Sequence, residues 1–574
     1  MLSCTQLSVE TADGKRILCN ADAIFSSGKM HAVIGPSGCG KTTLMKAILG
    51  MIKRTGIAEF DGEQIHSCDE IAGAIGFAPQ FTLAQPNLTV EETFRYALAL
   101  NVADRHERER RLQSVLETTK LAPHADKLVG SLSGGQTRRV GLGLELTLAP
   151  RYLVCDEVTS GLDPNSEDEL LGLMRELIES DGKTIICIIH NLAKLPLFNT
   201  ITVVSAGNVI FQGSFPELCK YFEIENPLQL YNSMESHPTD FWVQKWQESR
   251  DEIYGADPEN FCDDNADVDA ADDNATDDKP KAALSQTEHA GFLSQLFTLL
   301  ARRFRLLFRD AGYLALTLAI TFGFPCIVVL FALDGLPQVQ VLPIDEMQMI
   351  SLSVFEQAIQ VQLKNSAVAT LATGLVLFQV ILLALMGANN GGREIAAERN
   401  LYEKERMTGL RPAAYALSKI LFTALIAIFQ GAWMCVFVKV ICKFPGEWLP
   451  QIATMSGVCV AMTLICLGFS ALMKSPEKAS LLSIYLVGFQ LPLSGIVLEL
   501  PKALVWVFRP FINVFWGWSG FFDAMSTSAI YDAYTKMNAN AEIFSVNVSL
   551  CVLVLHAIGG AILVFIGCMQ RRPL

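Results

Sequence analysis

One stretch of the chain combines glycines, a lysine and a hydroxyl in a spacing that suits phosphate binding. Residues 35–42 read Gly-Pro-Ser-Gly-Cys-Gly-Lys-Thr, after the apolar run Met30–Ile34 and before the helix-like stretch Thr43–Leu49. Between a strand and a helix, such glycines let backbone N–H groups close around phosphate oxygens. Lys41 would neutralise the β- and γ-phosphates of a nucleotide, and Thr42 would offer its hydroxyl to Mg²⁺. The predicted nucleotide-binding residues are Gly35, Pro36, Ser37, Gly38, Cys39, Gly40, Lys41, Thr42 and Thr43.

Two neighbouring carboxylates follow a second apolar run. Asp156 and Glu157 come directly after Tyr152–Cys155, a run that is typical of a buried strand. Asp156 would hold Mg²⁺, either directly or through water. Glu157, one residue later, can face the γ-phosphate and activate water as a general base. For this pair taken alone, an acidic helix cap is the alternative interpretation.

Further short motifs stand in a fixed order around these two. The sequence Leu-Ser-Gly-Gly-Gln at 132–136 ends twenty residues before Asp156. With it, the chain resembles the ATP-binding cassette (ABC) transporters, whose signature sequence is LSGGQ. The resemblance implies that Gln80 belongs to the Q-loop, Asp163 to the D-loop, and that His190 is the switch histidine after the apolar run 184–189.

The resemblance also implies a role for each of these residues. The catalytic residues would be Glu157, His190 and Gln80, and the Mg²⁺ ligands would be Thr42, Gln80 and Asp156. The signature residues that would contact the ATP held by a second chain are Leu132, Ser133, Gly134, Gly135 and Gln136. Val158 and Asn191 depart from the family pattern, which usually has proline and glutamine at these positions.

The composition places these motifs on a membrane protein. Of the 574 residues, 51% are hydrophobic and only 18% are charged, against about 25% charged in a typical soluble domain. The net charge of −14 argues against a nucleic-acid partner that binds to a broad basic face. Six apolar runs are near the ~20 residues that cross a bilayer. They cover about 313–333, 366–387, 417–438, 452–473, 479–498 and 543–569.

These patterns predict an α/β P-loop nucleotide-binding domain followed by an all-α six-helix transmembrane domain. The predicted parts are a nucleotide-binding domain at 1–245, an acidic disordered linker at 246–290, an amphipathic connecting helix at 291–311 and a transmembrane domain at 312–574. The linker holds ten acidic residues within 257–278. It therefore has too little apolar surface to fold into an ordered structure. Lysines and arginines between the runs orient this multi-pass membrane protein with the nucleotide-binding domain and both termini in the cytosol.

One further apolar stretch is interrupted. Ala503–Phe522 contains Arg509-Pro510 and three tryptophans. Because tryptophan favours the headgroup layer, we interpret this stretch as re-entrant or interfacial. A seventh span is the alternative.

The order of the two domains resembles the G subfamily of ABC transporters, the white-type half-transporters. Residues 398–409 and 493–497 resemble that subfamily's cytosolic joint and fifth span. The resemblance implies an ATP-hydrolysing transporter that pairs with a second copy or a related half-transporter in the lipid bilayer. Its substrate would be a hydrophobic, lipid-like or amphipathic small molecule that is exported or flipped. A nucleotide-gated channel or a regulatory protein without net export is the alternative.

The substrate cavity would lie between the second and fifth spans. Ordinary helix packing is the alternative for each cavity residue, because apolar stripes pack by default. An amide in hydrocarbon needs a partner, which singles out Gln379 among them. The predicted cavity residues are Phe378, Gln379, Phe489, Gln490, Ile496 and Val497.

Overall fold

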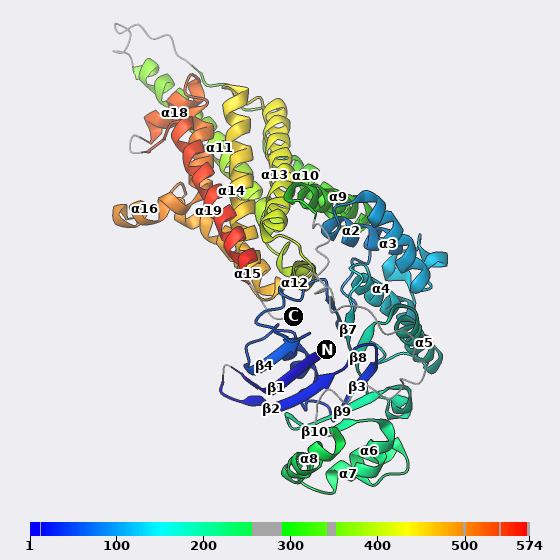
Figure 1. Ribbon diagram of the computed structural model, residues 1–574. Coiled ribbons are helices and arrows are strands. Elements are labelled where there is room, and N and C mark those ends of the chain that lie inside the picture. Colours follow the sequence, from blue (N-terminus) through cyan, green and yellow to red (C-terminus); the bar gives the residue numbers. More distant parts are fainter. Residues whose placement is uncertain (12, 255–289, 341–351, 498–500, 539–540, 571–574) are drawn as a thin grey trace. The chain divides into compact units, whose positions relative to one another are not determined.

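The chain divides into two compact units. The first unit comprises Met1–Gln295 and Leu401–Leu410, and the second comprises Leu296–Asn400 and Arg411–Arg572. The computed structural model describes residues 1–11, 13–254, 290–340, 352–497, 501–538 and 541–570 (Figure 1). The acidic stretch 257–278 lies outside these ranges, so the predicted linker stays a prediction there.

The first unit contains a largely parallel sheet of six strands. The central strands β3, β8 and β7 are buried along their whole length, which explains why the sequence shows them as unbroken apolar runs. Their order in the sheet is β10-β9-β3-β8-β7-β6, and only β10 runs antiparallel to its neighbour. The strands are β3 (Met30–Ile34), β6 (Ile75–Ala78), β7 (Tyr152–Asp156), β8 (Thr184–Ile188), β9 (Thr200–Ser205) and β10 (Asn208–Gly213).

A second, antiparallel sheet is formed by strands from the N-terminal part of this unit. Its order is β2-β1-β4-β5, and its apolar face forms a core with helix α1 (Lys41–Ile48). The strands are β1 (Leu2–Glu10), β2 (Arg16–Phe25), β4 (Thr55–Phe60) and β5 (Glu63–Gln64). A separate apolar core joins the six-stranded sheet to the remaining helices.

Side-chain caps determine where several of these helices begin. Thr89 and Glu92 form a capping box at the start of α2, and Asp163 accepts from a backbone N–H in the first turn of α5. The helices are α2 (Val90–Asn101), α3 (Arg105–Thr118), α4 (Gly134–Leu146), α5 (Pro164–Asp181), α6 (Phe215–Phe222), α7 (Leu230–Glu235) and α8 (Thr239–Tyr254).

The predicted boundary between residues 245 and 246 falls inside helix α8. Trp246 is 4% exposed, and its ring lies 5.6 Å from that of Phe211 in β10. This aromatic packing continues the α/β fold beyond 245. The polar composition that follows Trp246 hides this in the sequence.

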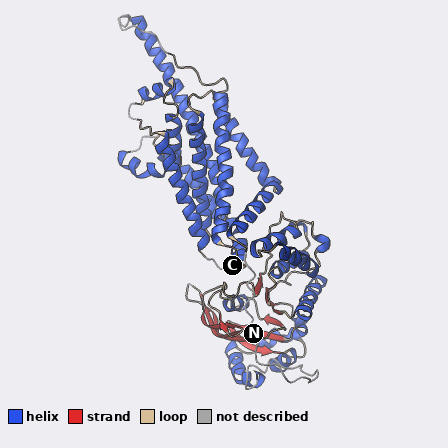
Figure 2. Cartoon of the chain, turned by 45° about the horizontal axis from the view of Figure 1, so that its top comes forward, coloured by secondary structure: helices blue, strands red, loops and turns tan. Residues whose placement is uncertain are grey.

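The second unit is helical (Figure 2). Its helices are α9 (Phe292–Arg309, whose first turn belongs to the first unit), α10 (Ala311–Val329), α11 (Leu352–Gly391), α13 (Pro412–Cys442), α14 (Trp448–Leu472), α15 (Pro476–Leu493), α16 (Lys502–Phe508), α17 (Asn513–Asp523), α18 (Ala529–Met537) and α19 (Val546–Met569). Helix α12 (Arg399–Met407) begins in the second unit and continues into the first.

Within the described residues, five helical segments are long and apolar enough to cross a membrane. They are Ala311–Val329, Ile359–Met407, Pro412–Cys442, Trp448–Leu472 and Val546–Met569, and each contains or overlaps one of the predicted spans. The remaining predicted span, 479–498, corresponds to α15, which ends at Leu493 after eighteen residues. Glu477 and Lys478 in its first turn and Pro492 near its end explain why this helix is short and less apolar.

The interrupted stretch 503–522 forms two short helices. Helix α16 has seven residues and α17 has eleven, so neither reaches the ~20 residues of a span. Trp506 is 80% exposed, but Trp516 and Trp518 are 6% and 2% exposed and belong to the core of the unit. These two tryptophans therefore pack inside the unit rather than at its surface, and the re-entrant or interfacial position of the stretch stays a prediction. Gly517 explains the burial, because a Cβ there would lie 2.2 Å from Val458, so α17 approaches α14 closely.

Candidate nucleotide site

The loop between β3 and α1 has a backbone that only glycine can supply at its first position. Gly35 has φ +150°, and a Cβ there would lie 2.1 Å from the carbonyl oxygen of Val204. Gly40, which also has a positive φ, is the N-cap of α1. The loop therefore leads from the end of a buried strand directly into a helix N-terminus, the arrangement that suits phosphate.

Lys41 is held against this loop. Its Nζ donates to the carbonyl oxygens of Gly35 at 2.9 Å and Pro36 at 3.0 Å, and the residue is 5% exposed. Tyr231 donates its hydroxyl to the same Gly35 oxygen at 3.2 Å. No sequence signal marks Tyr231, because it lies almost two hundred residues further along the chain.

Thr42 and Asp156 lie together. The Thr42 hydroxyl donates to Asp156 Oδ1 at 2.9 Å, so the first turn of α1 and the end of β7 place two oxygen atoms side by side. Burial raises the pKa of the Asp156 carboxyl, the Thr42 hydrogen bond lowers it, and the nearby Glu157 charge raises it. Hydroxyl and carboxylate oxygens are donors that Mg²⁺ prefers, so these residues fit the ion that the sequence predicts.

The three predicted catalytic residues meet at the Glu157 carboxylate. Gln80 Nε2 donates to Glu157 Oε2 at 3.0 Å, and His190 Nε2 lies 2.6 Å from Glu157 Oε1. They follow β6, β7 and β8, which are neighbours in the parallel sheet, and this brings residues far apart in sequence to one edge. Glu157 has φ +52°, a left-handed backbone that is uncommon outside glycine and asparagine.

The signature residues form the start of helix α4. Ser133 is its N-cap: its hydroxyl accepts from Gln136 N–H at 3.3 Å, and Gln136 Oε1 accepts from Ser133 N–H at 3.1 Å. Gly135 allows close approach to Ser166, whose hydroxyl and N–H both donate to Asp163. These hydrogen bonds lower the pKa of Asp163. Within the described part of the chain, no hydrogen bond joins residues 132–136 to residues 35–43.

Several contacts around the site were not predicted. Thr82, two residues after Gln80, donates its hydroxyl to the carbonyl oxygen of Thr137 in α4 at 3.0 Å. The guanidinium of Arg138 lies 5.9 Å above the Phe81 ring. These contacts tie the Q-loop to the signature helix. Asn191, which departs from the family pattern, donates to Glu167 Oε2 at 2.8 Å.

The predicted cavity residues of the second unit do not share one environment. Gln379 is 1% exposed, and neither of its amide atoms has a hydrogen-bond partner among the described residues. Gln490 is also buried, and its Oε1 accepts from Val514 N–H at 3.2 Å. Phe489 and Val497 are 61% and 59% exposed in this chain. Phe378 and Ile496 are half-buried against the core of the unit.

Comparisons with known proteins agree with both units. Residues 18–160 match the ABC transporter family, and residues 294–525 match the ABC-2 type transporter family. The ABC transporter ATP-binding/permease protein Rv1747 of Mycobacterium tuberculosis is 26% identical over a match that covers 84% of this chain and 53% of that protein. Methionine import ATP-binding protein MetN 1 of Rhodococcus jostii is 36% identical over 36% of this chain and 62% of its own length. ABC transporter G family member 1 of Dictyostelium discoideum is 30% identical over 40% of this chain and 30% of its own length.

The fold and the site define a P-loop nucleotide-binding protein with a helical membrane unit. With both family matches in this order, the chain carries an ABC transporter domain followed by an ABC-2 type transporter domain, the arrangement with the ATP-binding domain first that is similar to the G subfamily. It is an integral membrane protein with several spanning helices. The chain spans between 30% and 62% of the length of the three relatives named above.

Proposed function

We propose that this chain is a half-transporter that hydrolyses ATP as a dimer and exports or flips a lipid-like or amphipathic molecule. The observation that supports this most directly is the Glu157 carboxylate, which Gln80 and His190 contact beside the Thr42–Asp156 pair. A domain that only bound nucleotide would not need a general base at that point. The same chain carries the apolar helices of the second unit.

In the proposed mechanism, Lys41 and the backbone N–H groups of residues 35–42 hold the phosphates. Thr42, Asp156 and Gln80 would hold Mg²⁺, which supplies charge neutralisation for the phosphate oxygens when it is bound. Glu157 accepts the proton of the attacking water as a general base. His190, 2.6 Å from the Glu157 carboxylate, orients it by hydrogen bonding.

The proposed dimer follows from the place of the signature. Residues 132–136 make their hydrogen bonds within α4 and not with the phosphate loop of the same chain. Ser133 and the N–H groups of Gly134 and Gly135 are therefore proposed to donate to the γ-phosphate of ATP on a second copy or a related half-transporter. ATP would bridge the two first units, and hydrolysis would remove that bridge.

The proposed substrate is apolar or amphipathic because the helices of the second unit are. Phe489 and Val497 are exposed large apolar side chains in this chain, and Gln379 offers a buried amide with no partner among the described residues. A pathway built from such residues suits a lipid-like molecule with one hydrogen-bonding group better than an ion or a sugar. The nucleotide-binding unit and both termini are proposed to face the cytosol.

Reconstitution of the purified chain in liposomes tests the proposal. ATPase activity would be measured with sterols, phospholipids and planar aromatic compounds, with Glu157→Gln as the inactive control. We expect at least one of these classes to stimulate the wild-type activity several-fold. ATP-dependent ion current without stimulation would identify the alternative, a nucleotide-gated channel, and a chain that stays monomeric with ATP would contradict the proposed dimer.

A further inference from the structure

A buried ion pair holds the segment Leu401–Leu410 in the first unit. Lys404 Nζ lies 2.7 Å from Glu145 Oε1, and the two side chains are 9% and 4% exposed. Lys404 belongs to helix α12, and Glu145 to the last turn of α4. Removing one partner from a buried pair leaves the other charge buried and uncompensated, which is strongly unfavourable. Helices α4 and α12 are therefore expected to keep this contact when α4 moves.

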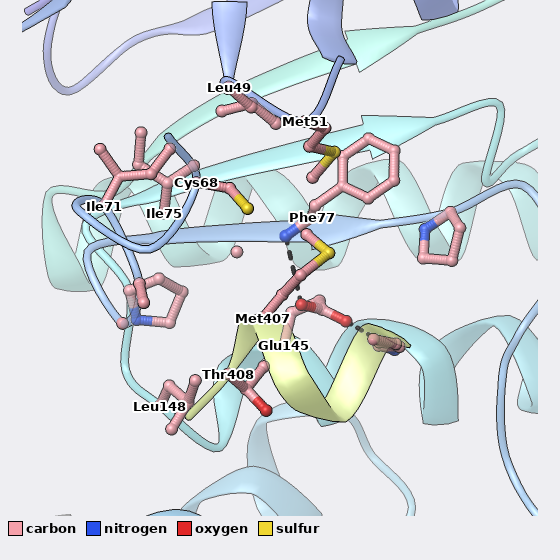
Figure 3. A pocket seen from close by; sticks show the side chains of 16 residues that line it. Leu49, Met51, Cys68, Ile71, Ile75, Phe77, Glu145, Leu148, Met407 and Thr408 are labelled. Atoms are coloured by element: carbon pink, nitrogen blue, oxygen red, sulfur yellow. Dashed lines mark hydrogen bonds and ion pairs between the residues drawn. The ribbon is translucent and has the colours of Figure 1, made fainter. Parts of the chain in front are cut away.

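Glu145 also contacts the strand that leads to the Q-loop. Its second carboxylate oxygen, Oε2, accepts from the backbone N–H of Phe77 at 3.2 Å, three residues before Gln80 (Figure 3). Helix α4 begins at the signature residues, with Ser133 as its N-cap. One carboxylate thus connects the signature helix, the strand before the catalytic glutamine and helix α12.

Other contacts hold the same segment of the first unit. Met407 lines a pocket with Met51, Cys68 and Phe77, beside the Glu145 carboxylate (Figure 3). Asn101 Nδ2 lies 3.4 Å from the hydroxyl of Thr408. Gln295 Nε2 donates to the carbonyl oxygen of Gly409 at 3.1 Å.

Helix α12 is held equally firmly at its other end, within the second unit. The guanidinium of Arg399 donates to the carbonyl oxygens of Gly567 at 2.9 Å and Gln570 at 2.6 Å. It also lies 3.4 Å from the carbonyl oxygen of Ala471. These carbonyls belong to the C-terminal ends of α14 and α19, where a cation is favourable. Arg399 and Lys404 therefore anchor a single short helix in different units.

We infer that Glu145 is a positioning residue that passes nucleotide-driven movement of helix α4 to helix α12 through its ion pair with Lys404. This inference rests on the proposed function, since it requires ATP to move the signature helix. Glu145 is not among the residues proposed to hold phosphate or Mg²⁺, and its carboxylate contacts Phe77 N–H and Lys404. Through the Glu145 carboxylate, the signature helix α4 contacts helix α12, whose first residue, Arg399, is bonded to α19 in the second unit.

Hydrogen exchange of the full-length chain in lipid nanodiscs tests this, with ATP and Mg²⁺ as the probe. The Glu157→Gln background is used because it is expected to bind ATP without hydrolysing it. Exchange is compared with and without ATP in residues 35–49 of the first unit and in helices α11 and α15 of the second. We expect both regions to respond in the parent chain. Glu145→Gln and Lys404→Gln should keep the response of residues 35–49, the first response. They should reduce the response of α11 and α15, the second response, at least fivefold.

Two further double variants distinguish the effect of losing the ion pair from the effect of losing stability. The exchanged pair, Glu145→Lys with Lys404→Glu, should restore at least half of the second response. The apolar pair, Glu145→Met with Lys404→Met, fills the same space without charge, so it should fold and lack the response. Glu169→Gln is the matched control. Glu169, on α5, is the exposed partner of Arg139, which lies on α4 like Glu145, so this substitution should leave both responses unchanged.

Each outcome decides a different question. A parent chain whose first unit responds to ATP while α11 and α15 do not would contradict the proposed function and also the role of Glu145, because no movement would reach the second unit. A parent chain that responds in both units, with a full response in either Gln variant, would overturn the inferred role of Glu145. If the Gln variants do not fold, a full second response in the apolar pair or none in the folded exchanged pair would overturn it.

Discussion

In the first unit, Glu157 is contacted by Gln80 and His190, while in the second unit Gln379 is buried with neither amide atom bonded among the described residues. Two other buried amides of the second unit share a hydrogen bond: Asn390 donates to Gln430 at 2.7 Å, and Gln430 in turn donates to the Thr321 hydroxyl at 3.1 Å. Such bonds join membrane helices. A site for one fixed reaction needs every polar group positioned, whereas a transport pathway can leave one group for its cargo.

The largest effect is expected at Glu157, the proposed general base. Glu157→Gln removes the proton acceptor and keeps the side-chain shape, so the ATPase rate should fall about 10²–10⁴-fold while ATP binding is retained. Phosphate release and nucleotide binding would be measured on the same preparation. Glu176→Gln, at an exposed ion pair with Lys120, is the control that should leave both unchanged. An ATPase rate within threefold of wild type would show that another group accepts the proton.

The phosphate loop should be intolerant of a single methyl group. In Gly35→Ala the new Cβ would meet the Val204 carbonyl oxygen at 2.1 Å, so the loop must shift. We expect a loss of roughly 3 kcal/mol in the free energy of unfolding and at least tenfold weaker ATP binding. Gly14→Ala is the matched control, because Gly14 also has a positive φ but no atom within 4 Å of an added Cβ. Equal effects in the two variants would mean that backbone strain, and not the close contact, sets the requirement.

Acid should weaken the first unit through His31. This histidine of β3 is 1% exposed, and burial lowers its pKa from 6.5 to about 4, although its Nε2 donates to Ser26 O at 2.9 Å. Below pH 6.5 the unfolded chain takes up a proton that the folded chain does not, so stability falls as the pH drops toward 4. At pH 5 the loss from this group is about 2 kcal/mol.

His31→Gln should remove this part of the pH dependence. It keeps an N–H donor for Ser26, and it cannot titrate. The measurement is the difference in unfolding temperature between variant and wild type, taken at pH 7.5 and at pH 5. Unfolding is followed in the peptides that contain β3, so that the first unit is observed. A difference that does not change with pH would contradict a neutral buried His31.

The smallest effect on stability is expected in the membrane unit. Gln379→Leu replaces a buried amide that lacks partners among the described residues, so the chain should become more stable by about 1 kcal/mol. Thermal unfolding in detergent measures this, and Gln430→Leu, which breaks two hydrogen bonds, should do the opposite. If Gln379 contacts the substrate, the same variant loses substrate-stimulated ATPase activity. A stable variant with full stimulation would remove Gln379 from the pathway.

The sequence supported the two units unequally, for physical reasons. Parallel strands are short apolar runs whose C-terminal ends meet at one edge, so motifs after β3, β6, β7 and β8 could be expected to converge. In an apolar helix every face has similar composition, so the pattern located the spans without showing that Gln490 binds Val514 while Phe489 is exposed. Contacts such as Lys404–Glu145 and Tyr231–Gly35 join distant segments with no motif, so only the structure reveals them.

The left-handed backbone of Glu157 has a consequence for the balance between folding and chemistry. A non-glycine residue in this region costs about 1–2 kcal/mol that glycine would avoid, whereas only the glutamate carboxylate can contact Gln80 and His190. Folding and catalysis therefore favour different residues at one position of the chain. We therefore expect a chain with glycine at this position to be more stable and to lack the proposed ATPase activity, because glycine relieves the backbone strain and removes the carboxylate.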